Sequence, residues 1–156
     1  TTAILAASVI GLFRDTIEKV VALAALMPIV ASMGGIAGTQ SLTVLIRAMA
    51  MGQINDRTEI WLVRREILVS LINGLLWAAV IAVIASYWFS DIRLGMIIAF
   101  ATVINLITAG MAGASLPLLL DRLNIDPALA GGVVLTTITD VVGFFAFLGL
   151  ATYFYG

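Results

Sequence analysis

The chain alternates long apolar segments with short polar connectors, and this pattern predicts a bundle of membrane-spanning helices. Five apolar blocks can be separated, at residues 1–13, 20–51, 61–89, 92–120 and from residue 126 to the C-terminal end. A helix needs roughly 20 apolar residues to cross the hydrocarbon core of a bilayer. Residues 1–13 fall short of that length, so we expect the first helix to be truncated at its N-terminus.

Local signals refine the boundaries of these helices. Asp126 and Pro127 form a plausible N-cap and first-turn pair for the last helix. The residues FRDTIEKV read as a polar connector, and SDIR reads as a tight turn. Pro28 and three glycines between residues 34 and 38 interrupt the second block, and Pro117 is expected to bend the fourth. Such breaks suit a helix that lines a cavity, because freed backbone groups need partners other than lipid.

The interfacial residues predict an orientation in the membrane. Trp61 lies at one end of the third block and residues 87–89 (YWF) at the other, as in an aromatic belt. One side of the predicted bundle carries five arginines and the other carries three basic residues. The first set is Arg47, Arg57, Arg64, Arg65 and Arg122, and the second is Arg14, Lys19 and Arg93. The arginine-rich side is therefore expected in the cytoplasm, with the N-terminus cytoplasmic and the C-terminus outside an inner (plasma) membrane.

Composition supports an integral membrane protein and narrows the chemistry. Hydrophobic residues make up 62% of the 156 residues and charged residues 11%, and the mean hydropathy is +1.16, far from the averages of soluble domains. A net charge of −1 argues against a nucleic-acid partner. Because the chain has no Cys and no His, disulfides, thiol catalysis and zinc sites built on those ligands are excluded. Any bound metal must be a hard cation on oxygen ligands.

Asp140 is the strongest candidate for a functional residue. It lies in LTTITDVVGFFAFLGLATYF, with no Lys or Arg within reach on the same helix. A carboxylate at that depth is tolerated only where it faces protein or water and meets a proton or cation. The alternative is a structural hydrogen bond between helices. Glu66, beside Arg64 and Arg65, is instead expected to be a solvated or paired interface residue.

Polar residues recur at helical spacing on the segments around this acid. On the second block Ser32, Thr39, Thr43 and Arg47 share a stripe with Ile36, and Gln40 lies beside it. On the last block Thr136, Asp140 and Gly143 share a face, and the fourth block carries a weaker set, Thr102, Asn105 and Thr108. The stripe indicates a face that meets water or a polar helix. The glycines also suit close helix packing, and each hydroxyl can bond its own backbone.

Three segments resemble the MgtE family of magnesium channels. The run PIVASMGGIAGTQSLTVLIRAM is similar to the family's Gly-rich second transmembrane helix, and GASLPLLLDRLNIDPALAGGVVLTTITDVVGFFAFLGLATYF is similar to its C-terminal end. The pieces DPA and TTITD…GF are the most specific. Glu66 and Gly74 in RREILVSLINGLLWA resemble the third helix. The resemblance covers essentially the whole chain, residues 1–156.

This resemblance implies an all-α homodimer with five transmembrane helices per subunit and a pore on the two-fold axis. The pore-centre carboxylate falls on Asp140, with Thr136 as a second metal-site residue. The implied transported ion is Mg²⁺, with Mn²⁺, Co²⁺ or Ca²⁺ as further candidates, and the family's cytosolic regulatory domains have no counterpart here. The implied pore-lining residues are Ser32, Gly35, Ile36, Thr39, Thr43 and Gly143.

One position departs from the family pattern, and two other functions compete with a channel. Family members commonly have Asn where this chain has Ile36 in GGIAGTQ. A proton- or sodium-coupled divalent-cation transporter could use the same Asp140, although paired repeats typical of such folds are absent. An intramembrane aspartyl protease needs a second buried acid. Since only Asp140 reads as one, we expect a channel for hydrated Mg²⁺ rather than an enzyme.

Overall fold

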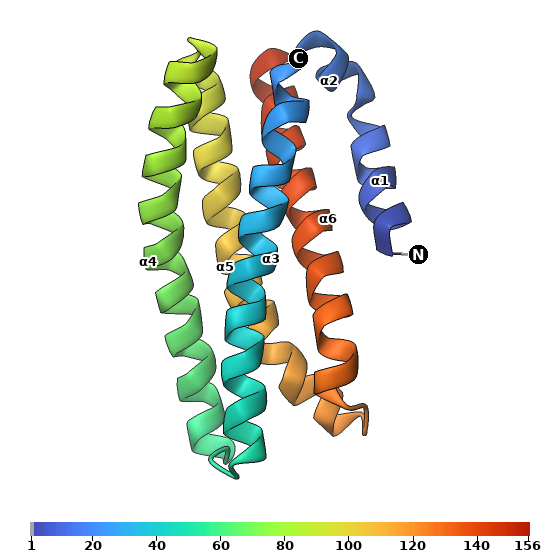
Figure 1. The fold of residues 1–156 in the computed structure, drawn as a ribbon, viewed down its shortest axis with the longest axis vertical. Helices are drawn as coiled ribbons and strands as arrows, with labels where there is room; N and C mark the ends of the chain where they lie inside the picture. The colour runs from blue at the N-terminus through green and yellow to red at the C-terminus, as the bar shows by residue number, and fades with distance from the viewer. Residues whose placement is uncertain (1) are drawn as a thin grey trace.

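The computed structural model describes residues 2–156, apart from the side chains of residues 56 and 57. Within this part the chain is all-helical, as the sequence predicts. Four helices are long and apolar enough to cross a membrane. They lie side by side, and two short helices flank one side of the bundle (Figure 1). In chain order the described helices are α1 (Thr2–Leu12), α2 (Arg14–Lys19), α3 (Ala22–Ala50), α4 (Asp56–Phe89), α5 (Ile92–Arg122) and α6 (Pro127–Tyr155).

Two aspartates set the starts of α5 and α6. Asp126 accepts a hydrogen bond from the Ala128 backbone N–H at 2.8 Å, and Pro127 occupies the first turn of α6, which confirms the predicted cap. Asp91 caps α5 in the same way, accepting from the Arg93 N–H at 2.8 Å. The FRDTIEKV segment, predicted as a polar connector, contains the short helix α2. Helix α4 also begins five residues before the predicted residue 61.

Helix α5 is the centre of the bundle. It packs against α3, α4 and α6, whereas α3 and α4 scarcely touch each other, and α1 lies against α6. Two glycines let α5 approach its neighbours closely. A Cβ built on Gly113 would lie 2.5 Å from the Gly38 carbonyl oxygen of α3, and one on Gly110 would lie 2.0 Å from Ser70 Oγ of α4. Small residues at helix crossings allow this contact where lipid leaves little hydrophobic drive between helices.

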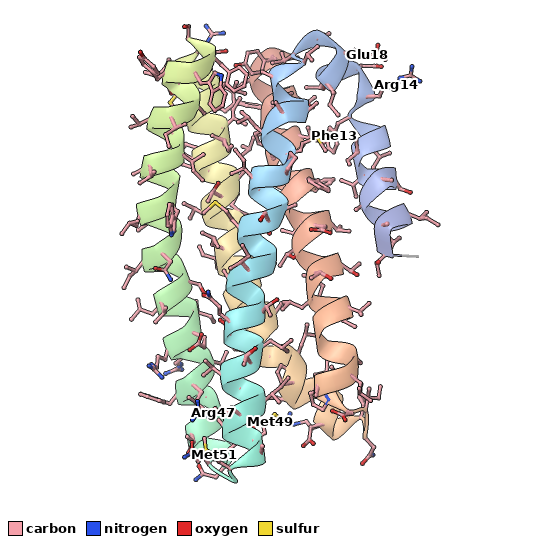
Figure 2. The ribbon with its side chains drawn as sticks, viewed as in Figure 1. Phe13, Arg14, Glu18, Arg47, Met49 and Met51 are labelled. Carbon is pink, nitrogen blue, oxygen red and sulfur yellow. The ribbon has the colours of Figure 1, made fainter. Side chains whose placement is uncertain are left out.

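The two ends of the bundle carry different connectors. The α3–α4 and α5–α6 connections lie at one end, and α2, the α4–α5 turn and the C-terminus lie at the other (Figure 1). Arg47 lies near the first end, and Arg14 with Glu18 near the second (Figure 2). At the first end Arg122 Nη2 donates to Glu59 Oε1 at 2.8 Å, which joins α5 to α4. Arg57, which contributed to the predicted orientation, has its side chain outside the described part.

A hydrogen bond between Asp91 and Tyr155 closes the other end and predicts an acid-sensitive fold. Tyr155 Oη donates to Asp91 Oδ2. This bond lowers the pKa of Asp91, burial opposes the shift, and the Arg93 and Leu94 backbone N–H groups add to it. A carboxyl with a lowered folded pKa stabilises the fold above its unfolded pKa of about 3.9 and loses that contribution as pH falls through the folded value.

We expect the melting temperature in detergent to decrease when the pH is lowered below about 4. The loss should be smaller in Asp91→Asn, and equal losses in both proteins would contradict the assignment.

Candidate functional site

A shallow, open groove lies on the outer surface of the bundle between α3 and α6. Its volume is about 470 Å³, and six residues line it: Ser32, Gly35, Ile36, Thr39, Gln40 and Thr136. Five of them belong to the site predicted from sequence. Thr43, also predicted, is exposed one turn further along α3. The structure thus brings most of the predicted α3 stripe together with Thr136 of α6 on one open face.

Three threonine hydroxyls on this face can act as hydrogen-bond acceptors. Thr39 Oγ1 donates to the Gly35 carbonyl at 2.8 Å, and Thr43 Oγ1 donates to the Thr39 carbonyl at 2.8 Å. Thr136 Oγ1 donates to the Gly132 carbonyl at 3.0 Å. The protons of these three hydroxyls are therefore committed to their own helices, and their oxygen lone pairs remain for the groove. The water molecules around a hydrated cation are donors, so such a surface suits that ligand.

The register between α3 and α6 fixes the level of Asp140 relative to this groove. A Cβ on Gly38 would meet Leu135 at 2.9 Å, and one on Gly143 would meet Val30 at 3.2 Å. Because both helices rise about 1.5 Å per residue, these contacts place Asp140 level with Met33. Asp140 therefore lies one turn beyond Thr136 on α6, near the level of Ser32.

The Asp140 carboxyl is half-buried and has no charged partner in the described part of the chain. The two ion pairs found there join other residues, Arg14 with Glu18 and Arg122 with Glu59. No three His, Cys, Asp or Glu side chains gather within reach of one metal ion among the described residues. A cation at Asp140 would therefore have to keep much of its water or meet a second protein chain.

Gly143, predicted to share a face with Asp140 and to line the pore, does not lie on the open surface of this chain. It is buried, and a Cβ there would lie 2.6 Å from Asn105 Nδ2 of α5. This glycine therefore faces the interior of the bundle and allows α6 to approach α5. On this chain alone Gly143 is a packing position behind the groove, and the predicted pore-lining role remains a prediction.

Glu66 was wrongly predicted to be a solvated or ion-paired interface residue. It is only 8% exposed and accepts a hydrogen bond from Ser41 Oγ at 2.8 Å. The close approach of α5 through Gly110 covers the backbone of this turn of α4. Asp140 is therefore not the only acid held away from the helix ends. Adjacent Arg64 and Arg65 suggested an aqueous position, but both are exposed on other faces of α4.

Sequence reasoning also gave too little weight to Asn105. Its side chain is 1% exposed, and its Nδ2 donates to the Val30 carbonyl of α3 at 2.8 Å. Thr102, one turn earlier, is equally buried. The three-residue spacing of these polar residues on an apolar helix was a visible signal. Which helices they would face depends on tertiary packing.

Comparison with known proteins shows the family of the chain. The family model for MgtE, described as a divalent cation transporter, matches residues 27–150. The chain is 36% identical over 151 residues to the magnesium transporter MgtE of Bacillus subtilis, covering 97% of this chain and 34% of that protein. It is 33% identical over 150 residues to the magnesium transporter MgtE of Thermus thermophilus, covering 96% of this chain and 33% of that protein.

A third relative shows the same coverage. The magnesium transporter MgtE of Enterococcus faecalis is 30% identical over 148 residues, or 95% of this chain and 33% of that protein. The chain therefore spans about a third of the length of the curated relatives it matches. The family match includes both helices that form the groove. This multi-pass membrane protein belongs to the MgtE family of divalent cation transporters.

Proposed function

We propose that this chain passes hydrated Mg²⁺ across the membrane as a homodimer, through a pore on the two-fold axis lined by α3 and α6. The observation that carries the proposal is the open groove between α3 and α6, where the Thr39 and Thr136 hydroxyls keep acceptor lone pairs, with Asp140 one turn beyond Thr136 on α6. Polar groups facing lipid are costly. A second copy placed over the groove would convert two half-grooves into one polar passage.

The two Asp140 carboxylates would then face each other near the axis. Mg²⁺ dehydrates reluctantly and usually keeps several waters, so a few oxygens around a hydrated ion are sufficient. The carboxylates supply the countercharge, and Thr136 with the hydroxyls of α3 accepts hydrogen bonds from the ion's waters. The arginine-rich end, which includes Arg47 and Arg122, faces the cytoplasm of a plasma membrane in this proposal, and the C-terminal end faces outside.

Two measurements test the proposal together. Purified protein in vesicles loaded with a Mg²⁺-sensitive dye should take up Mg²⁺ down its gradient. A single Cys introduced at Thr43, which is exposed on the same face, should cross-link two copies at low protein density. A matched Cys at Val83, exposed on α4, should not cross-link. Monomeric protein that still conducts would overturn the dimer-axis pore.

The same vesicles separate a channel from a coupled transporter. A channel needs only the Mg²⁺ gradient and the membrane potential, so uptake should be unchanged when proton or sodium gradients are collapsed. Uptake that stops without one of those gradients would favour the coupled mechanism at Asp140.

Ile36 provides a further prediction, because it departs from the amide common in the family. Its side chain is 59% exposed and borders both the α3–α6 groove and a second groove between α3 and α4. A branched alkyl group offers no hydrogen bond to a hydrated ion and favours dewetting of a narrow passage. We expect Ile36→Asn to raise Mg²⁺ flux or affinity, and Ile36→Ala to widen the path without improving selectivity over Ca²⁺. Unchanged uptake of both ions in both variants would place Ile36 outside the pathway.

A further inference from the structure

Asn105 occupies a costly position at the junction of three helices. Its Nδ2 donates to the Val30 carbonyl of α3, while Oδ1 is buried and has no hydrogen-bond partner. The amide cannot be reversed, because Oδ1 would then face the carbonyl oxygen. A buried polar atom left without a partner costs about 1–3 kcal/mol. Thr102 Oγ1, on the same face of α5, is also buried without a partner. Leucine would fill this space without that cost, so packing alone does not explain the asparagine.

Both groove helices, α3 and α6, place a glycine against the Asn105 side chain. A Cβ on Gly34 of α3 would lie 2.3 Å from Asn105 Nδ2, and one on Gly143 of α6 would lie 2.6 Å from the same atom. Neither distance is tolerated by a real side chain. Two glycines on different helices therefore form a socket for one amide. By contrast, a Cβ on Gly132 of α6 would meet nothing within 4 Å, so the socket is specific to this level of the helix.

The socket lies directly behind the candidate ion site. Gly143 is three residues from Asp140, which corresponds to about 4.5 Å along α6. Gly34 is followed by Gly35 and Ile36, which line the groove. A change in the separation of α3 and α6 at Asn105 would therefore shift Asp140 of α6 relative to Gly35 and Ile36 of the groove.

We infer that Asn105 is a positioning residue, which fixes the spacing of α3 and α6 at the level of Asp140 and so sets the discrimination between divalent ions. This inference rests on the proposed function. The Asn105 amide binds α3 through the Val30 carbonyl, and the width of the Asn105 side chain sets the distance between α3 and α6. Selectivity between Mg²⁺ and Ca²⁺ then depends on a residue that does not touch the ion.

The test measures two quantities in wild type and in Asn105→Leu: the distance between α3 and α6, and the Mg²⁺-to-Ca²⁺ uptake ratio. Spin labels at Ile29 and Phe145, which are exposed at nearly the same level of α3 and α6, report the spacing in labelled chains diluted with unlabelled protein in lipid. We expect the label distance to change and the Mg²⁺-to-Ca²⁺ uptake ratio to fall by about fivefold, while the melting temperature stays equal or rises. A purely structural role predicts lower stability with an unchanged ratio.

Steric complementation provides a second variant that does not depend on the folding of Asn105→Leu. Gly143→Ala should reduce the uptake ratio, and Asn105→Ser in the same chain should restore it, because the smaller side chain frees space for the new methyl group. Gly132→Ala is the matched control and should behave as wild type. Failure of Asn105→Ser to rescue Gly143→Ala would overturn the spacing role.

Asp140→Asn, measured in parallel, separates this inference from the proposed function. An unchanged label distance in Asn105→Leu overturns the positioning role, whatever Asp140→Asn does. A changed distance combined with wild-type uptake in Asp140→Asn contradicts the proposed ion site, and the spacing role of Asn105 stands.

Discussion

Replacing Asp140 by alanine is expected to lower Mg²⁺ uptake by roughly a hundredfold or more, with the protein still folded. Two unit charges about 4 Å apart attract by roughly 4 kcal/mol at an effective dielectric constant of 20. A methyl group supplies none of this attraction, and each loss of about 1.4 kcal/mol is a factor of ten. Dye-loaded vesicles measure the loss, and Asp140→Asn should retain a part of ion binding through its amide oxygen.

The folded state of Asp140→Ala can be checked separately, because no described side chain forms an ion pair with this carboxyl. Its melting temperature should therefore be close to that of wild type. Thr137→Ala on the same helix is a suitable control, since Thr137 Oγ1 donates only to the Val133 carbonyl of its own helix. Uptake at the wild-type rate in Asp140→Ala would remove this residue from the pathway.

Replacing Gly113 by alanine is expected to lower the stability of the fold by overpacking α5 against α3. The new Cβ would lie 2.5 Å from the Gly38 carbonyl oxygen, 2.9 Å from Ser41 Cβ and 3.2 Å from the Leu42 backbone nitrogen. Two of these atoms belong to the backbone of α3, so no side-chain rotation relieves the contact. Overpacking of this kind costs about 1–3 kcal/mol, and a lower melting temperature in detergent would report it.

Gly132→Ala is the comparison for this effect, because it adds the same methyl group to a helix at a position without neighbours. It should leave the melting temperature unchanged or slightly raised, since alanine favours the helical backbone over glycine. If Gly113→Ala and Gly132→Ala have the same melting temperature, the close contact between α3 and α5 is not present in the protein.

The parts of the fold that depend on local chemistry could be predicted from the sequence. The Asp126–Pro127 cap is a contact within one turn, and the apolar length of a span is a property of one segment. The predicted stripe from Ser32 to Thr39 also came together on one exposed face, because helical spacing alone decides which residues share a side.

The missed features depend on contacts between segments. Glu66 was predicted to be solvated or paired because Arg64 and Arg65 precede it, but it is buried against Ser41, 25 residues earlier, and Gly110, on the helix that follows. The burial of Gly143 within this chain likewise depends on another segment. A side chain from α5 occupies the space beside it, and no pattern within α6 indicates that contact.

The central place of α5 has a consequence for how the protein is made. Helices α3 and α4 scarcely touch each other, and each finds its main neighbour in α5, which is synthesised after both. Larger proteins assemble through intermediates whose unpaired surfaces are open to wrong contacts. During synthesis the first two long helices therefore precede the helix that supplies most of their contacts, and little besides the Ser41–Glu66 hydrogen bond joins them to each other. The insertion of α5 is thus the event that turns neighbouring spans into one domain.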